Sequence, residues 1–402
     1  MPDASPAAAS APLRILLGCD TFAPDVNGSA SFARQLAVGM ADRGHQVEIM
    51  APAPKGVRAG TYREMHGGTE FTVYRIYSWR WIFHPWLRFA LPWRAVANSK
   101  RVLALSKPDV VHFQSHFVLG RGLSIVAEQQ GVRLVGTNHT MPENIAQHVQ
   151  IMTKSMLKAL IRAQWRAAAR VFERCDAVTS PTRRSADYLE ENTGLRDTYA
   201  ISNGLRLDAY TPDFTARERN RIVFLGRADE EKHIEDLIRA VAKLDPALDV
   251  AVDILGDGDQ RQKLIALVEE LGLKDRIRVP GRVSYDELRS TLNRASVFAM
   301  PSIAELQSIT TMEAMASGLP VVAADAMALP HLVTHGVNGY LYPPRDVDAL
   351  AARLTDVLSA PEAERERMGR ASLQAVQAHD LDRTIDAFEA IYRGVPVTQP
   401  VE

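Results

Sequence analysis

The sequence predicts an α/β protein with two doubly wound domains, each built around a parallel sheet with helices on its faces. Three observations predict this fold class. The chain has 402 residues, enough for two domains of about 200 residues with substantial cores. A strand, a loop, a helix and a second strand follow one another from residue 13, and a similar series begins at residue 221. Between the two series, residues 208–220 carry a proline and several charges, which is typical of a linker.

The first half opens with an apolar strand at residues 13–17 and a loop at residues 20–29. Apolar residues at helical spacing from Phe32 onward then predict a helix. Gly28, beside the start of this helix, allows a phosphate or an acceptor group to approach the backbone, although turn chemistry explains a lone glycine equally well. Further strands are expected at residues 47–50, 109–113, 134–136, 175–180 and 201–204.

The second half alternates strands and helices in the same way. Strands are expected at residues 221–225, 250–255 and 277–279, and helices at residues 234–244, 286–293, 346–358 and 380–392. The sequence Gly-Asp-Gly-Asp at 256–259 could be taken for paired aspartates that hold a metal. We interpret it as a sharp turn between a strand and a helix, because nothing nearby supplies further oxygen ligands.

Two glutamates follow another strand. That strand, at residues 297–299, leads into a loop, and Ser308 is expected to cap a helix at residues 309–317. Glu305 lies in the loop, and Glu313 lies about two turns into the helix. Loops at the carboxyl ends of strands bind ligands in open α/β sheets, and helix N-termini attract anions. The plain alternative is two solvated glutamates.

Two cations mark an earlier loop of the same half. Arg227 and Lys232 straddle the start of the helix that follows strand 221–225. Two cations beside a helix N-terminus suit a diphosphate, because Arg can donate hydrogen bonds to two phosphate oxygens at once and Lys acts as a point charge. Two surface charges are the alternative.

Two basic segments contain all the tryptophans. Residues 71–108 have no acid, and in residues 151–174 a cation recurs at every fourth position. The tryptophans in these segments are Trp79, Trp81, Trp86, Trp93 and Trp165. Such a combination suits a membrane surface with anionic lipid. A solvated basic face, with the tryptophans in the core or in an acceptor site, is the alternative. No motif for reading nucleic acid accompanies the charge.

Three histidines lie in or just after predicted strands, namely His112, His116 and His139. A single histidine in such a place is commonly a hydrogen-bonded core residue. The presence of three histidines in such places favours the interpretation that one of them acts at the functional site. Their spacing matches no zinc motif, so no metal site is expected.

Composition excludes several classes. A net charge of -1 argues against a general nucleic-acid binder. The two cysteines cannot form a disulfide framework, which fits a reducing cytoplasm. Residues 1–12 are expected to be a disordered tail, and no apolar run reaches transmembrane length.

These segments together resemble a known family. FLGRADEEKHIEDLIRAV and PSIAELQSITTMEAMASGLPVVAAD are similar to the donor domain of family-4 retaining glycosyltransferases of the GT-B fold. DTFAPDVNGSASFARQLAVGMADRGHQVEIMAP resembles their opening, and SPTRRSADYL and ISNGL their middle. The resemblance covers about residues 13–358. It implies two Rossmann-like domains that face a central cleft.

The implied organisation has five parts. They are a tail at 1–12, an acceptor-binding domain at 13–205, a linker at 206–220, a nucleotide-sugar-binding domain at 221–375, and a C-terminal helix in 376–402 that packs back on the first domain.

The resemblance also implies roles for the charged residues. Arg227 and Lys232 would hold the donor diphosphate and stabilise the charge that develops as it leaves. Glu313 would accept hydrogen bonds from the ribose, and Glu305 would bind hydroxyls of the transferred sugar as a positioning group. Gly28 matches a loop that approaches the donor phosphates. Such enzymes require no metal.

The N–H groups of Leu306, Gln307 and Ser308 would complete the sugar cradle. Gln307 and Ser308 replace a Gly-Phe-Gly filling that is usual in the family, so they could alter the choice of sugar. The family's His-x-His is also absent, because Gln114 follows His112 at that place. His116 and His139 therefore share the expectation of contact with the reacting sugar.

The expected activity is retaining, metal-independent transfer of a hexose, with GDP-mannose favoured over UDP-glucose as the nucleotide-sugar donor. The expected acceptor is lipid-linked, as for a mannosyl- or glucosyltransferase of glycolipid biosynthesis. A cytoplasmic protein, peripheral on the inner face of the cell membrane, fits these expectations. The alternatives are a soluble acceptor, a sugar-nucleotide epimerase, and a non-catalytic nucleotide-sugar binder.

Overall fold

The structure is a computed structural model that describes residues 11–25, 27–80, 88–143 and 153–398. Most of the expected tail, residues 1–10, lies outside this range. The chain divides into two compact units. Among the described residues, unit 1 comprises residues 11–180, 186–199 and 385–398, and unit 2 comprises residues 181–185 and 200–384. Both are α/β units with largely parallel sheets, as predicted.

Unit 1 contains, among its described residues, an eight-stranded sheet in the order β10-β9-β8-β7-β1-β2-β4-β3. Its strands are β1 Arg14–Gly18, β2 Gln46–Pro52, β3 Gly60–His66, β4 Thr69–Ile76, β7 Val110–Phe113, β8 Arg133–Thr137, β9 Ala177–Ser180 and β10 Tyr199–Ala200. β1 pairs in parallel with β2 and β7, whereas β3 runs antiparallel to β4 at the edge. A separate ribbon pairs β5 Ser78–Arg80 with β6 Arg88–Ala90.

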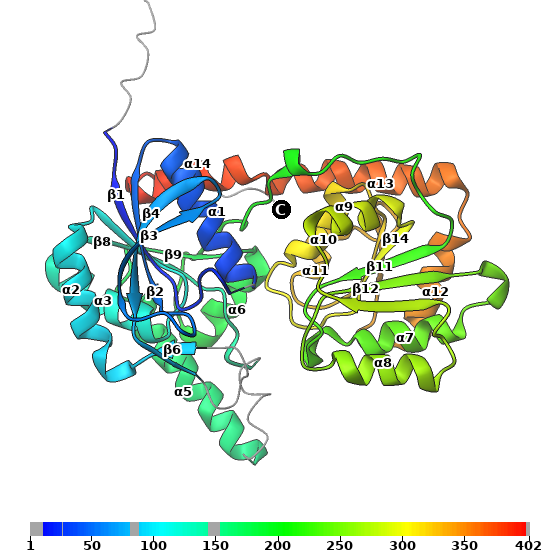
Figure 1. Ribbon diagram of the computed structural model, residues 1–402, viewed down its shortest axis with the longest axis horizontal. Coiled ribbons are helices and arrows are strands. Elements are labelled where there is room, and N and C mark those ends of the chain that lie inside the picture. Colours follow the sequence, from blue (N-terminus) through cyan, green and yellow to red (C-terminus); the bar gives the residue numbers. More distant parts are fainter. Residues whose placement is uncertain (1–10, 26, 81–87, 144–152, 399–402) are drawn as a thin grey trace, which may run out of the picture. The chain divides into compact units, whose positions relative to one another are not determined.

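The helices of unit 1 cover its sheet (Figure 1). They are α1 Gly28–Asp42, α2 Ala95–Ser106, α3 Val118–Gln130, α5 Lys154–Phe172, most of α6 Arg183–Thr193, and the later part of α14 Leu381–Tyr392. α14 is fastened by polar contacts, since Arg43 forms an ion pair with Asp386 and His112 bonds to the Tyr392 hydroxyl.

Unit 2 has a parallel sheet in the order β13-β12-β11-β14-β15-β16. The strands are β11 Arg221–Leu225, β12 Ala251–Leu255, β13 Ile277–Gly281, β14 Val297–Met300, β15 Val321–Ala324 and β16 Gly339–Tyr342. The helices are α7 Ile234–Lys243, α8 Arg261–Glu270, α9 Tyr285–Arg294, α10 Ile309–Ala316, α11 Leu329–Leu332, α12 Val347–Leu358 and α13 Glu362–Val376. In Figure 1, α9, α10 and α13 lie on one face of the sheet, and α7, α8 and α12 on the other.

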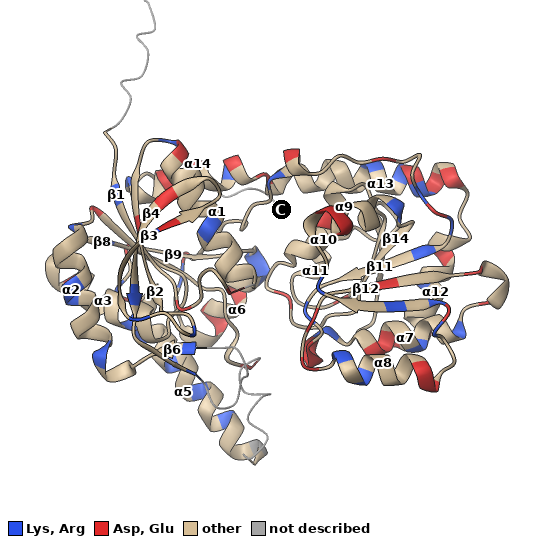
Figure 2. Ribbon diagram, viewed as in Figure 1, with Lys and Arg blue, Asp and Glu red and all other residues tan. Residues whose placement is uncertain are grey.

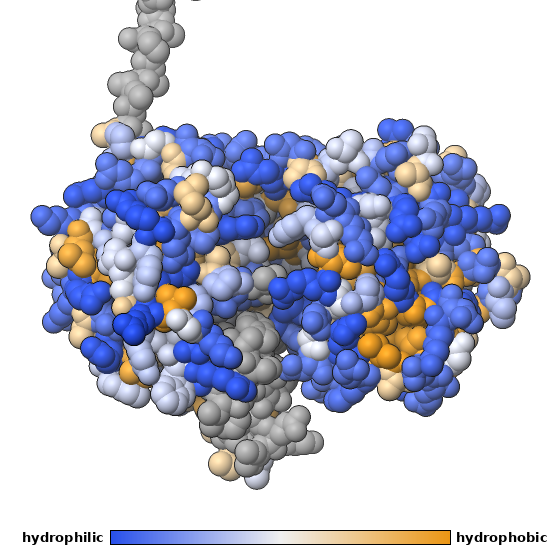
Figure 3. Space-filling view, viewed as in Figure 1, coloured by the Kyte–Doolittle hydropathy of each residue, from blue (hydrophilic) through white to orange (hydrophobic). Residues whose placement is uncertain are grey.

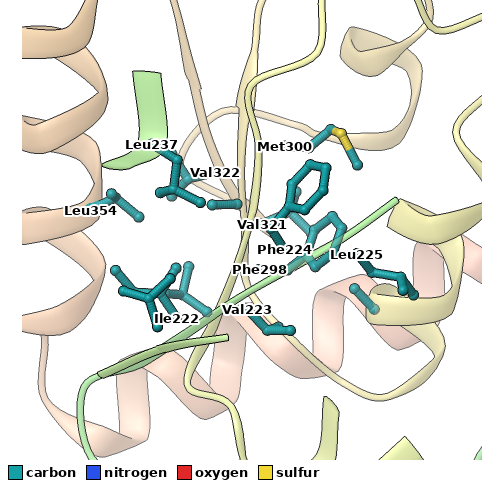
Figure 4. Close-up of a cluster of buried hydrophobic side chains, with 14 of the residues drawn as sticks. Ile222, Val223, Phe224, Leu225, Leu237, Phe298, Met300, Val321, Val322 and Leu354 are labelled. Carbon is teal, nitrogen blue, oxygen red and sulfur yellow. The ribbon is translucent and has the colours of Figure 1, made fainter. Parts of the chain in front are cut away.

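The core of unit 2 explains why its strands are continuous apolar runs. Phe224 on β11 and Phe298 on β14 lie among buried residues of the sheet (Figure 4). Leu237 of α7 and Leu354 of α12 belong to the same cluster. Because helices cover both faces, neither face of a central strand needs polar residues. Each fully buried side chain of this kind contributes about 1.5–3 kcal/mol relative to exposure.

The predicted strand at residues 201–204 is wrong. The strand there is the short β10, and the chain turns irregular after it. Gly204 has a φ of 71°, in the left-handed region, which ends extended structure. Leu205 then forms an isolated bridge to Asp380. Residues 201–205, which we call the crossing segment, therefore form an irregular stretch of unit 2 and not a strand of a sheet.

The surface in Figure 3 is mostly hydrophilic, with a hydrophobic area on unit 2. Within the described ranges, no helix combines the length and the hydropathy needed to cross a membrane.

Candidate functional site

The candidate site in unit 2 lies where the sheet reverses its strand order. β11 lies between β12, its successor in sequence, and β14, which pairs with it through Ile222↔Val297 and Val223↔Phe298. The loops after β11 and β14 consequently leave the same edge of the sheet side by side. Ligands of doubly wound sheets bind at such a switch point.

Lys232 and Glu305 meet at this point. The Lys232 Nζ atom lies 2.5 Å from Oε1 of Glu305, and the two side chains are 14% and 10% exposed. A backbone bond of 3.2 Å from Ile303 N to the Glu231 carbonyl holds the two loops together. An ion pair with so little exposure is poorly screened by solvent, so it fixes both groups. The structure thus brings together a cation and a carboxylate that the sequence placed in separate motifs.

Arg227 lies in the same loop after β11. Its guanidinium forms ion pairs with Asp229 and with Glu231, the latter at 3.0 Å. Burial raises the pKa of Asp229, while Arg227 opposes that shift. Arg227 remains 38% exposed, so its side chain can also meet a ligand. Neither Asp229 nor Glu231 was singled out from sequence, although both follow the cation within four residues.

The loop after β14 is held by residues distant in sequence. Thr182 Oγ1 donates to the Leu306 carbonyl at 2.9 Å. Gln307 accepts from the Asn203 N–H at 2.9 Å and donates from Nε2 to Ser202 Oγ at 2.7 Å. The Gln307 side chain is therefore engaged with the crossing segment.

Ser308 occupies the N-cap position of α10, as expected, but it does not cap through its side chain. Its Oγ bonds to Thr311 Oγ1 at 2.8 Å, and its φ is 73°. A residue with a Cβ in this left-handed conformation costs about 1–2 kcal/mol. This geometry gives a physical reason why glycine suits the position. Across the described chain, no acceptor bonds to the N–H groups of residues 306–308.

Glu313 lies in α10 and is bound by a residue that sequence reasoning missed. The Tyr210 hydroxyl donates to Oε1 of Glu313 at 2.6 Å. Burial raises the pKa of Glu313, and the bond from Tyr210 opposes the shift. Arg289 lies over the Tyr210 ring, 5.7 Å from its centroid. Residues 206–220, which we expected to form a linker, thus contribute to unit 2.

The Gly-Asp-Gly-Asp sequence forms the predicted turn between β12 and α8. Gly256 has a φ of 132°, and a Cβ there would lie 1.8 Å from the Gly226 carbonyl oxygen. A glycine is therefore required by the close approach of the two loops. In the part of the chain that the structure describes, no group of three or more His, Cys, Asp or Glu residues could hold a metal.

In unit 1, Gly28 is the first residue of α1, and Asn27 caps the helix by accepting from the Ala30 N–H at 2.8 Å. Asp20, which follows β1, was missed. It is buried and accepts from Ser115 Oγ at 2.7 Å and from the Leu119 N–H at 3.0 Å. Burial raises the pKa of Asp20 to about 6. Its position directly after a central strand was the signal that could have identified Asp20 as a candidate site residue.

The three histidines have different surroundings. His112 is a core residue that bonds to Thr137 and Tyr392, each at 2.6 Å. His139 bonds to Gln114 Oε1 at 3.0 Å, and burial lowers its pKa to about 3. His116 is buried with both ring nitrogens lacking a hydrogen-bond partner among the described residues. Burial lowers the pKa of His116 to about 4.

Comparison with known families decides the class of the protein. A family model described as Glycosyl transferases group 1 matches residues 212–374, and one described as Glycosyltransferase Family 4 matches residues 26–209. The chain belongs to the GT-B glycosyltransferases. The site residues of unit 2 lie in the first match, apart from Thr182, the crossing segment and Tyr210.

Two curated relatives of this glycosyltransferase match nearly its whole length. A GDP-mannose-dependent alpha-mannosyltransferase of Mycolicibacterium smegmatis is 27% identical over 94% of this chain and 98% of the relative. An alpha-monoglucosyldiacylglycerol synthase of Streptococcus pneumoniae is 23% identical over 94% of this chain and 85% of the relative.

Solved structures share the fold of the glycosyltransferase. A sucrose-phosphate synthase from Thermosynechococcus elongatus superposes with a TM-score of 0.79 at 21% identity, over 95% of this chain and 99% of the other. The Anabaena protein HepE, solved with UDP-glucose, gives a TM-score of 0.72 at 18% identity, over 95% of this chain and 100% of the other.

Proposed function

We propose that this glycosyltransferase moves a hexose from a nucleotide diphosphate sugar to a lipid-linked acceptor, with retention of anomeric configuration and without a metal. The observation that carries the proposal is the meeting of Lys232 and Glu305 at the switch point of unit 2. Arg227 on the same loop supplies a second cation. A diphosphate requires compensating positive charge, which Arg227 and Lys232 supply, beside unpaired N–H groups, when phosphate oxygens join or replace their carboxylate partners.

Each residue then has one task. Arg227 and Lys232 bind the diphosphate and stabilise the charge that develops on it as the glycosidic bond breaks. Glu313 accepts hydrogen bonds from the ribose, in place of or beside the bond from Tyr210. Glu305 accepts from hydroxyls of the sugar.

Retention follows if the acceptor oxygen attacks on the face that the phosphate leaves. The anomeric C–O bond to the phosphate breaks, the bond to the acceptor oxygen forms, and the acceptor proton passes to the leaving phosphate. Glu305, held in its ion pair, positions the sugar and forms no covalent bond to it. His116 and His139 both stay candidates for contact with the sugar: the ring nitrogens of His116 are unpartnered but buried, and His139, which is partly exposed, bonds to Gln114 through Nε2 alone.

We favour GDP-mannose as donor, with UDP-glucose next. The name of the M. smegmatis relative supports the first, and the sugar nucleotide in the HepE structure supports the second. Gln307 holds Ser202 and Asn203 through its side chain, so it can also influence the choice of sugar by positioning the loop after β14.

A lipid-linked acceptor at an anionic membrane surface is supported by α5. Lys158, Arg162, Arg166 and Arg170 are exposed along one side of this helix, which carries no acid (Figure 2). Trp79 and Trp93 are also exposed, at 63% and 78%. Trp165, in contrast, is a core residue that donates to Glu143, and Trp81 and Trp86 lie outside the described residues. The name of the S. pneumoniae relative, a glycolipid synthase, points the same way.

A panel of nucleotide sugars tests the proposal. The donor should raise the thermal unfolding midpoint by mass action. The nucleoside diphosphate part of the donor should be released when acceptor lipid is added. The transferred sugar should keep its anomeric configuration, as seen by NMR of the product. Failure of every nucleotide sugar to bind, or wild-type turnover by Glu305→Ala, would contradict the proposal.

A further inference from the structure

A cavity of about 660 Å³ lies in unit 1, and the exposed Trp79 named above is part of its lining. It opens beside the carboxyl ends of β2 and β4, which pair in parallel up to Pro52↔Ile76. The ribbon of β5 and β6 forms another wall. The walls that carry the argument contain Val57, Arg58, Tyr77, Trp79, Arg80 and Arg88.

The lining is basic and contains no acid. Arg58, Arg80 and Arg88 form no ion pair with a carboxylate anywhere in the described ranges. Asp25 lies close enough to Arg88 to feel its charge, but it does not line the cavity. Three cations that converge on one cavity without an acid favour an anionic occupant.

Arg88 is held in place before any ligand arrives. Its Nε donates to Ser78 Oγ at 2.9 Å and its Nη2 donates to the Ser78 carbonyl at 2.8 Å. Ser78 Oγ in turn donates to the Ala53 carbonyl at 2.6 Å, which fastens the ribbon to the loop after β2. A guanidinium fixed in this way binds phosphate oxygens with little further loss of side-chain entropy.

Two aromatic rings accompany the cations. Trp79 is 63% exposed and Tyr77 is 46% exposed, which is unusual for side chains of this size. Exposed rings beside cations offer apolar faces to the C–H groups of a sugar or polyol, while the cations bind its charged group. The combination suits a phosphate ester and not a bare inorganic ion.

We propose that this cavity binds the phosphate ester of the acceptor, next to a sugar or polyol group that rests on Trp79. That the ester belongs to the acceptor rests on the proposed function, whereas the binding of a phosphate ester in this cavity does not. The ester can belong to a free sugar or polyol phosphate or to a lipid headgroup, and the chemistry of recognition is the same for both.

The test uses the full chain and two probes. Calorimetric titration with sn-glycerol 3-phosphate reports a free ester, and co-sedimentation with phosphatidylglycerol in phosphatidylcholine vesicles reports a headgroup. The cavity variant Arg58→Gln/Arg80→Gln changes two exposed side chains. The matched control, Arg239→Gln/Lys263→Gln, removes the same charge from exposed positions of unit 2.

We expect the cavity variant to weaken binding of at least one probe by tenfold or more, and the control by less than twofold, estimates of the order found for charge-assisted hydrogen bonds. Loss with glycerol phosphate identifies a free ester, and loss with vesicles alone identifies a headgroup. Equal affinities of the cavity variant and the wild type for both probes, or an equal loss in the control, would overturn the assignment. If the wild type binds no nucleotide sugar, the proposed function fails, but these titrations still decide the cavity.

Discussion

The ammonium group of Lys232 lies 2.5 Å from the carboxylate of Glu305, although 73 positions separate the two residues. Without a donor, the cation proposed for the diphosphate and the carboxylate proposed for the sugar neutralise each other. Removing either one leaves the other charge nearly buried and unpaired, which is costly. The pair therefore links stability and catalysis.

Lys232→Met is expected to lower kcat by about 10²–10³-fold, because a fixed cation at the leaving group is lost. It should also destabilise the protein by about 3 kcal/mol, since Glu305 loses its partner. The double variant Lys232→Met/Glu305→Gln removes the unpaired charge, so it should regain stability without regaining activity. Steady-state kinetics and thermal unfolding measure the two effects. A double variant no more stable than Lys232→Met would count against the pair as a structural link.

Tyr210→Phe removes the hydroxyl that donates to Glu313. We expect the donor KM to rise about tenfold with little change in kcat, the size expected for a hydrogen bond to a charged group. The bond lowers a pKa that burial raises, so its loss should raise the pKa of Glu313 further. Donor binding needs the ionised carboxylate. On acidification, the donor KM should therefore begin to rise at a higher pH in Tyr210→Phe than in the wild type.

The control for this prediction is Tyr340→Phe, a tyrosine on β16 away from Glu313. KM values measured across the acid range for the wild type and both variants decide the result. Coinciding profiles for Tyr210→Phe and the wild type would show that Tyr210 does not position Glu313.

His116 should make stability depend on pH in a defined window. Burial lowers its pKa from 6.5 to about 4, so between these values the unfolded chain binds a proton that the folded chain does not. Its contribution is fully present above pH 6.5 and is lost as the pH falls toward 4. The thermal midpoint of His116→Phe should accordingly fall less between pH 7 and pH 5, as about one proton is removed from the linkage.

Differential scanning calorimetry of His116→Phe and the wild type at a series of pH values between 5 and 7 measures this difference. An unchanged slope in His116→Phe would mean that His116 binds protons equally in the folded and the unfolded chain, which would contradict the prediction.

The basic side of α5 should govern binding to anionic vesicles. Each cation near such a surface contributes about 1 kcal/mol, so Arg162→Gln/Arg166→Gln/Arg170→Gln should weaken partitioning by about 100-fold. Arg239→Gln/Lys263→Gln/Arg282→Gln, which removes three exposed cations from unit 2, should weaken it far less. Flotation at low and high salt measures both. A similar loss in the two variants would mean that net charge, and not α5, drives the binding.

The sequence alone determined the alternation of strands and helices, because buried parallel strands must be apolar on both faces and helices must carry apolar residues at their own period. It also located Arg227, Lys232, Glu305 and Glu313, since each lies at a fixed distance from the end of a strand or the start of a helix. Their roles came from family resemblance and remain proposals.

The tertiary structure decided which of these residues meet. Strand order placed β11 beside β14, so Lys232 found Glu305, and no local pattern encodes that pairing. It also brought Tyr210 to Glu313 from a segment that looked like a linker, and it engaged Gln307 with Asn203. These contacts join residues that are far apart in the sequence and that meet only when the chain folds around a shared core. The spacing of residues along the chain therefore does not encode them.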